Sequence, residues 1–310
     1  MIYFAAAIVQ RRRTGEAMRR IVLTGEHSVQ VVALIPGLMY AGLIYWKKSL
    51  NVADALVLTA IYVGYLVLLT KMPPQDEEGI DELERIPRAI VLSPRPRRIA
   101  LITLLFVIGG ALIYFSAEPF LGSLFALSVG LGVPSFVFIQ WVAPFLSEFP
   151  EGLSTFYWAR TVYRAPMALM NLVSSNINQW TLLMAMLPVV LSISIGGAAS
   201  IPMDSQQELE LLMTIGQQLI GLLFLMNMEL IWWEAGGLFL LWFVQFCFSA
   251  IPASVPVLGP IGPHIHYGIT IAYFAWSAWE LLRLLFGRKK PEAFRAFAEI
   301  WHAHVTAGAD

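Results

Sequence analysis

Two glutamates stand three residues apart where a long apolar run ends. Glu148 and Glu151 lie in "FLSEFPEGLS" (145–154), and Ser147 comes four residues before Glu151. Side chains three and four residues apart share one face of a helix, so we expect these three to point in one direction. They would then offer two carboxylates and a hydroxyl to a cation. The alternative is that this stretch ends a helix and leaves Glu151 solvated in a loop.

A stripe of amides and hydroxyls follows in the next apolar segment. Asn171, Ser174, Ser175 and Asn178 recur at three- and four-residue spacing, which on a helix places them within about 100° of arc. Carboxylate, amide and hydroxyl oxygens are hard ligands, suited to Ca²⁺, Na⁺ or H⁺ and unsuited to soft metals. A stripe that faces the two acids would favour a cation site. Alternatively, the stripe forms hydrogen bonds between packed helices.

The elements that carry these residues belong to a very apolar chain. Of the 310 residues, 58% are hydrophobic and 13% are charged, and the mean hydropathy is +0.68. A bilayer core of about 30 Å needs about 20 mostly apolar residues per helix, and such runs recur along the chain. A β-barrel would show short alternating segments instead. The sequence therefore predicts an all-α polytopic membrane protein, in which an intramembrane carboxylate persists where it faces a cavity or a partner.

Eight transmembrane helices are expected. If the eight alternate, most Lys and Arg residues fall on one side, which the positive-inside rule assigns to the cytoplasm. Both termini would then be cytoplasmic, in a plasma or inner cell membrane. Lys47 and Lys48 are the exception to this charge distribution. The expected spans are 28–46, 51–71, 99–130, 133–157, 166–196, 209–230, 235–252 and 267–286.

Two stretches of the chain resemble each other without a gap. Residues 28–65 align onto 208–245. Under the expected orientation the first helix of one copy runs outward and that of the other runs inward, as in transporters with inverted repeats. The pairs that carry the match are Ile35 with Ile215, Asp54 with Glu234, Ala55 with Ala235, Leu58 with Leu238 and Tyr62 with Trp242.

Three further acids have a functional and a structural interpretation. Glu118, directly before Pro119, either lines a pathway or forms a hydrogen bond at a helix kink. Glu234 is expected at a cytoplasmic boundary of the membrane. Glu280 is expected at the interface, near Arg283.

Two quoted segments resemble the second α-repeat of the sodium/calcium exchanger superfamily, the Ca²⁺:cation antiporters. They are "LGVPSFVFIQWVAPFLSEFPE" (131–151) and "ALMNLVSSNINQ" (168–179). That family typically reads "LGVS", a stretch, "GTSLPE", a loop, and then "GNIIGSNIxD". The spacing from Leu131 to Glu151 fits without a gap, and the "SN" pair falls on Ser175 and Asn176.

The resemblance implies a set of cation ligands. The ion-binding glutamate of the family falls on Glu151, and its Thr and Ser fall on Ser147 and Glu148. Its Asp or Asn after "GSNI" falls on Gln179. Glu148 therefore replaces a hydroxyl, and two carboxylates so close are expected to share a proton near neutral pH, which favours proton coupling. The full predicted ligand set is Glu151, Glu148, Ser147, Ser175, Asn178, Gln179 and Asn171.

The apolar-Pro-Glu motif of the first α-repeat does not occur in this sequence. The segment "MIYFAAAIVQRRR" corresponds to the end of the third family helix, so the inverted-repeat fold is expected to be N-terminally incomplete. A truncated start is the favoured explanation, and a second chain that supplies the missing repeat is an alternative. The expected division is 1–71 (remnant of the first half), 72–98 (charged cytoplasmic linker), 99–252 (second half with the α-repeat) and 253–310 (extra helix and tail).

The expected function is secondary active cation antiport by alternating access, in which Ca²⁺ or another cation is exchanged for Na⁺ or H⁺. The expected partners are the lipid bilayer and inorganic cations, with no covalent cofactor and no nucleic acid. One alternative is an exchanger remnant, or partner subunit, that does not transport. The other is a membrane-embedded lipid-modifying enzyme, which the scattered aspartates and the absence of a Gly-x-Ser-x-Gly or His-Glu-x-x-His pattern disfavour.

Overall fold

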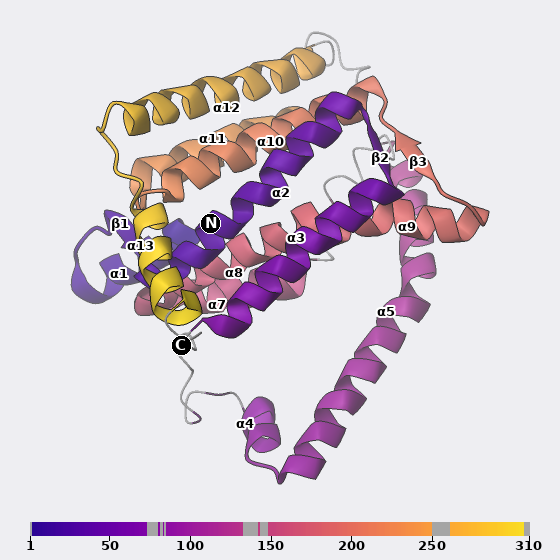
Figure 1. Ribbon diagram of the computed structural model, residues 1–310, viewed down its shortest axis with the longest axis horizontal. Coiled ribbons are helices and arrows are strands. Elements are labelled where there is room, and N and C mark those ends of the chain that lie inside the picture. Colours follow the sequence, from indigo (N-terminus) through magenta and orange to yellow (C-terminus); the bar gives the residue numbers. More distant parts are fainter. Residues whose placement is uncertain are drawn as a thin grey trace. The chain divides into compact units, whose positions relative to one another are not determined.

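The structure is a computed structural model that describes residues 2–72, 80, 83, 85–132, 142, 148–249 and 261–306 (Figure 1). The described chain is helical apart from four strands of three residues each. It divides into two compact units, Met1–Met72 with Glu148–Asp310, and Pro73–Ser147. The all-α fold class is thus confirmed.

The larger unit holds most of the helices, and the smaller unit holds α4 (Arg85–Val91) and α5 (Arg95–Leu131). In the larger unit α8 continues through the π-turn η4 into α9 without a break. Its helices are α1 (Ile2–Thr14), η1 (Gly25–His27), α2 (Ser28–Lys47), α3 (Val52–Lys71), α7 (Phe149–Arg160), η3 (Val162–Arg164), α8 (Ala165–Asn178), η4 (Gln179–Leu183), α9 (Met184–Ile195), α10 (Ser205–Leu225), α11 (Trp232–Ser249), α12 (Ile261–Leu285), α13 (Glu292–Trp301) and η5 (His302–Thr306).

Among the described residues, five helices are long and apolar enough to cross a membrane, and each coincides with an expected span. α11 matches the span expected at 235–252 and is apolar but shorter. α12 matches the span expected at 267–286. Its Tyr, Trp and charged residues lower its mean hydropathy, and it is not among the five helices. The span expected at 133–157 lies largely outside the described residues. The five are Gly25–Lys47, Val52–Lys71, Arg95–Leu131, Val162–Ile195 and Ser205–Leu225.

The internal repeat recurs in the structure at the register of the sequence alignment. α2 and α3 correspond to α10 and α11, and the turn between the helices of each pair is alike. Lys48 has φ 56° and Met228 has φ 58°, the positive-φ non-glycine residues of the described chain. A left-handed backbone is uncommon for residues with a Cβ, so its recurrence at equivalent positions indicates one turn built twice.

The strands join one copy of the repeat to the other. β1 (Arg20–Val22) pairs antiparallel with β4 (Glu229–Ile231), and β2 (Ser49–Asn51) pairs antiparallel with β3 (Ser200–Pro202). The registers are equivalent as well: Arg20 opposes Ile231, and Ser200 opposes Asn51. The offset of the sequence alignment therefore maps one sheet onto the other.

An acidic residue lies in the first turn of the second helix of each copy. The Asp54 carboxylate accepts a hydrogen bond from the backbone N–H of Asn51 (2.7 Å), and the Glu234 carboxylate accepts one from that of Ile231 (3.1 Å). These bonds satisfy N–H groups that a helix leaves unpaired at its start. The sequence alignment pairs Asp54 with Glu234, and the structure gives both the same role.

The counter-charges of these two acids come from different places. Asp54 receives a hydrogen bond from Tyr40 (2.9 Å) and pairs with Lys47, both on the preceding helix α2.

The neighbouring lysine is also paired. Lys48 pairs with Glu208 (2.8 Å), and this hydrogen bond, with the carboxylate charge, raises the pKa of Lys48. Both lysines that break the expected charge distribution are thus neutralised by neighbouring acids.

Glu234 belongs instead to a buried cluster with the C-terminal segment. Lys289 Nζ lies 3.2 Å from Glu234 Oε1 and 3.4 Å from Glu280 Oε2, and Arg283 Nη1 lies 2.8 Å from Glu280 Oε1. Only 1% of Glu234 and 0% of Glu280 are exposed. The expected proximity of Arg283 to Glu280 is confirmed. The burial of both acids against Lys289 was not anticipated, because sequence spacing does not reveal a lysine that meets them only in the folded chain.

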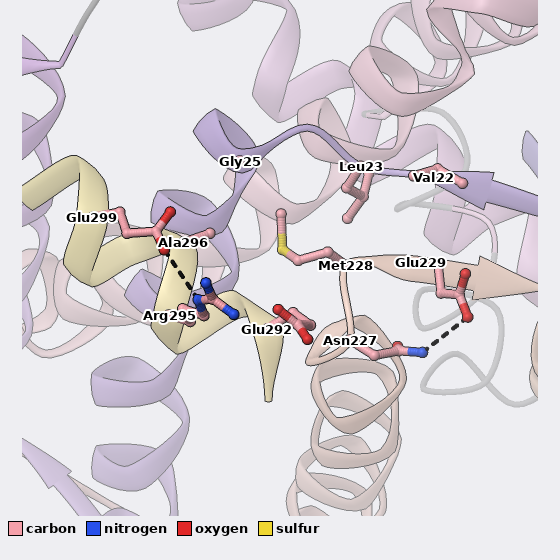
Figure 2. A pocket seen from close by; sticks show the side chains of 10 residues that line it. All are labelled: Val22, Leu23, Gly25, Asn227, Met228, Glu229, Glu292, Arg295, Ala296 and Glu299. Carbon is pink, nitrogen blue, oxygen red and sulfur yellow. Dashed lines mark hydrogen bonds and ion pairs between the residues drawn. The ribbon is translucent and has the colours of Figure 1, made fainter. Parts of the chain in front are cut away.

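The C-terminal helices pack onto the repeat core. α12 lies along α10 and beside α11, and α13 contacts α2 and η1 (Figure 1). The backbone N–H of Ala293 donates to the carbonyl of Met226 (2.9 Å). Figure 2 shows α13 facing the chain at Val22–Gly25 and Asn227–Glu229 across a shallow cavity of about 350 Å³. The segment after 260 is therefore part of the larger unit.

Candidate cation site

Glu151 lies in the first turn of α7, where it faces the neighbouring helix α8. Ser175 on α8 donates a hydrogen bond from Oγ to Glu151 Oε2 at 2.9 Å. The second carboxylate oxygen, Oε1, is buried and has no hydrogen-bond partner among the described residues. A buried carboxylate oxygen without a partner is costly, so this atom is the strongest indication of a ligand in the site.

Glu148 is the N-cap residue of α7, one turn before Glu151. Gln179 Nε2 donates a hydrogen bond to Glu148 Oε1 at 2.7 Å. Gln179 is the first residue of the π-turn η4, four residues along the helix from Ser175. The two acids of α7 therefore meet two polar residues of one continuous helix, as the spacing in the sequence predicts.

The remaining stripe residues contact two side chains that the sequence did not single out. Asn171 Nδ2 donates to Thr155 Oγ1 at 3.3 Å, and Ser174 Oγ lies 3.1 Å from the hydroxyl of Tyr65 on α3. Thr155 follows Glu151 by four residues, so helical spacing could have identified it. Tyr65 has no local signal, because α3 reaches the site only through tertiary packing.

The structure thus pairs four of the seven predicted ligands, Glu151 with Ser175 and Glu148 with Gln179, and places Asn171 against Thr155 on the same two helices. Asn178 is half-buried at the end of α8. Ser147 lies outside the described residues. In the described part of the chain no three His, Cys, Asp or Glu side chains gather around one point. A cation here would therefore be bound by two carboxylates together with amide and hydroxyl oxygens.

Comparison with known proteins identifies the domain. The profile of the family "Sodium/calcium exchanger protein" matches residues 101–251. This chain carries a sodium/calcium exchanger domain. A search of curated proteins found no match. Members of this exchanger family are transporters, so the enzyme alternative is set aside.

A solved structure resembles this chain over nearly its whole length. The crystal structure of the H⁺/Ca²⁺ exchanger CAX superposes with a TM-score of 0.81 and 28% sequence identity, over 97% of this chain and 70% of that one. The predicted family resemblance is thereby confirmed, and the chain is an integral membrane protein. The region matched by the family profile includes α7 and α8, which carry the candidate site.

Proposed function

We propose that this protein is a secondary active antiporter that exchanges Ca²⁺ for H⁺ by alternating access, with Glu151 as its central ligand. The supporting observation is the unpartnered, buried Oε1 of Glu151 beside the bonded Oε2. A cation at this oxygen would supply the electrostatic partner that the described residues do not provide.

The chemistry of the site suits a hard divalent ion. Ca²⁺ takes six to eight oxygen ligands in flexible geometry, from carboxylates, amide and hydroxyl groups. Two carboxylates, Glu148 and Glu151, balance its charge. We propose the remaining ligands among Asn171, Ser175, Asn178 and Gln179, whose continuous helix packs on α7, together with Ser147.

Two observations favour H⁺ over Na⁺ as the exchanged ion. The structural relative is described as an H⁺/Ca²⁺ exchanger. In addition, Glu148 stands where the family typically has a hydroxyl, so this site holds a second group that can carry a proton. In the proposed cycle Ca²⁺ and H⁺ occupy the two carboxylates alternately.

We further propose that a second chain contributes another set of oxygen ligands, which faces the polar residues of α7 and α8. The cell membrane, with both termini cytoplasmic, is the proposed location. The membrane orientation follows from the basic side chains that flank the spans. Chemical crosslinking of the protein in native membranes would show whether a second chain is present.

The proposed exchange can be measured directly in liposomes. With the purified protein in vesicles loaded with Ca²⁺ indicator, an imposed pH gradient is expected to drive Ca²⁺ uptake, and dissipation of that gradient with a protonophore should stop it. A Na⁺ gradient of equal size is expected to drive much less uptake. Uptake driven only by Na⁺ would contradict the H⁺ assignment. Ca²⁺ binding without uptake under either gradient would favour the exchanger remnant that does not transport.

Tyr65→Phe is expected to weaken Ca²⁺ binding modestly. The change removes only the hydroxyl that contacts Ser174, and one such hydrogen bond corresponds to about a threefold rise in the KM for Ca²⁺. Tyr62→Phe is the matched control, because Tyr62 lies on the same helix one turn earlier and its ring is 6.5 Å from that of Tyr65. If Tyr65→Phe and Tyr62→Phe changed the KM for Ca²⁺ equally, the hydrogen bond between Tyr65 and Ser174 would contribute nothing to Ca²⁺ binding.

A further inference from the structure

The helix that carries the polar stripe contains a π-turn directly at the candidate site. Residues Gln179–Leu183 form η4 between α8 and α9. A π-turn inserts one extra residue into a helical turn, which rotates the side chains that follow and is frequent at functional sites. Its first residue, Gln179, is the one that bonds Glu148. The geometry of η4 therefore bears directly on the contact between these two side chains.

Helix α2 crosses this π-turn at a glycine. A Cβ on Gly37 would lie 3.3 Å from Cγ2 of Thr181 and 3.5 Å from Cβ of Trp180. Both neighbours are buried, with 0% of Thr181 and 5% of Trp180 exposed. The first distance is tighter than ordinary van der Waals contact, so any side chain at residue 37 would push against the π-turn. Gly42, also on α2, would meet nothing within 4 Å.

Thr181 cannot easily move its methyl group out of the way. Its hydroxyl donates a hydrogen bond to the carbonyl of Ile177, which lies at the entrance to the π-turn. Turning the side chain to relieve a contact at Cγ2 would break this buried bond, at a cost comparable to an unsatisfied polar group. An added Cβ at residue 37 would therefore displace the backbone of η4 instead of rotating the Thr181 side chain.

We infer that Gly37 is a positioning residue for the cation site: the close approach of α2 to Thr181 holds the π-turn that places Gln179 against Glu148. α2 itself packs on α10 and on the C-terminal helix α13. The contact at Gly37 thus connects the candidate site to the repeat core. This inference rests on the proposed function, since it concerns the same ligands.

Four full-length variants test it: Gly37→Ala, Gly42→Ala, Thr181→Ser and the double variant Gly37→Ala with Thr181→Ser. Gly37→Ala is expected to raise the Kd and the KM for Ca²⁺ about fivefold with little change in maximal rate, about 1 kcal/mol of binding. Gly42→Ala should leave both constants unchanged. Serine lacks Cγ2 but keeps the hydroxyl, so the double variant should return both constants to within about twofold of the wild type.

Two outcomes would overturn the inference. One is a Gly37→Ala protein that binds Ca²⁺ as tightly as Gly42→Ala does. The other is a double variant as impaired as Gly37→Ala alone. If Gly37→Ala does not fold, Thr181→Val gives the test: it keeps the shape and removes the bond to Ile177, and an unchanged Kd would refute the role of the π-turn.

The result is separable from a failure of the proposed function. If the wild type takes up Ca²⁺ and Glu151→Gln does not, an unchanged Kd in Gly37→Ala contradicts only the positioning role. If the wild type takes up no cation under any gradient, the antiport proposal fails, while the Kd values of the four variants still decide whether Gly37 shapes the site.

Discussion

Glu151→Gln is expected to abolish Ca²⁺ exchange in the protein with all ligands of the site present. Glutamine keeps the shape of the side chain and its ability to accept from Ser175, but it removes the negative charge that a divalent cation requires. It also replaces one carboxylate oxygen with an NH₂ group, which cannot coordinate a cation. The uptake rate should fall at least a hundredfold, as for a loss of about 2.7 kcal/mol in binding of the transported ion.

The measurement is Ca²⁺ flux into vesicles under a fixed pH gradient, with equal protein incorporation checked by blotting. Glu151→Asp keeps the charge but withdraws it by one methylene, so an intermediate rate is expected. Glu16→Gln is the matched control, since Glu16 is exposed beyond the end of α1. A Glu151→Gln protein that exchanges Ca²⁺ at the normal rate would mean that the site lies elsewhere.

Lys289→Met is expected to destabilise the protein strongly without touching the candidate site. Lys289 is buried, with 3% of its side chain exposed, between Glu234 and Glu280. Methionine fills a similar volume, but its substitution leaves Glu234 buried with no cation and Glu280 with Arg283 alone. Removal of one member of a buried charge cluster costs about 3–5 kcal/mol. A drop of several degrees in the melting temperature of the detergent-solubilised protein should follow.

Lys290→Met provides a control one residue away, because Lys290 is exposed. Its melting temperature should match that of the wild type. Combination of Lys289→Met with Glu234→Gln removes both an acid and its cation, so about half of the lost stability should return. If Lys289→Met melts like Lys290→Met, the ion pairs contribute nothing, and the stability of the C-terminal segment comes from its apolar contacts.

Local patterns in the sequence predicted the helices and half of the site. Apolar runs of membrane length became α2, α3 and α10, because their hydrophobic content determines them without reference to other segments. Spacing of three and four residues predicted that Glu151 faces α8, and the quoted motif identified Ser175 and Gln179. The alignment of Asp54 with Glu234 predicted equivalent positions, and the structure shows equivalent capping bonds.

Contacts between distant segments could not be predicted in this way. No local pattern relates Lys289 to Glu234, or Tyr65 to Ser174, since these pairs meet only when several helices have packed. The π-turn at Gln179 is equally invisible, because an inserted residue does not alter the apolar content of the helix. The role of Gly37 could not be predicted from the sequence either, because glycine occurs in membrane helices for many reasons.

The pairing of strands that lie far apart in the sequence constrains the order in which the core can assemble during synthesis. β1 is synthesised well before its hydrogen-bonding partner β4, which ends at Ile231. Residues 20–22 therefore leave the ribosome long before anything can pair with them, whereas β2 and β3 meet earlier. Pairings of such long sequence separation form late, because the intervening chain must be closed into a loop first. We therefore expect the pairing of β1 with β4 to be among the last contacts of the described core to form.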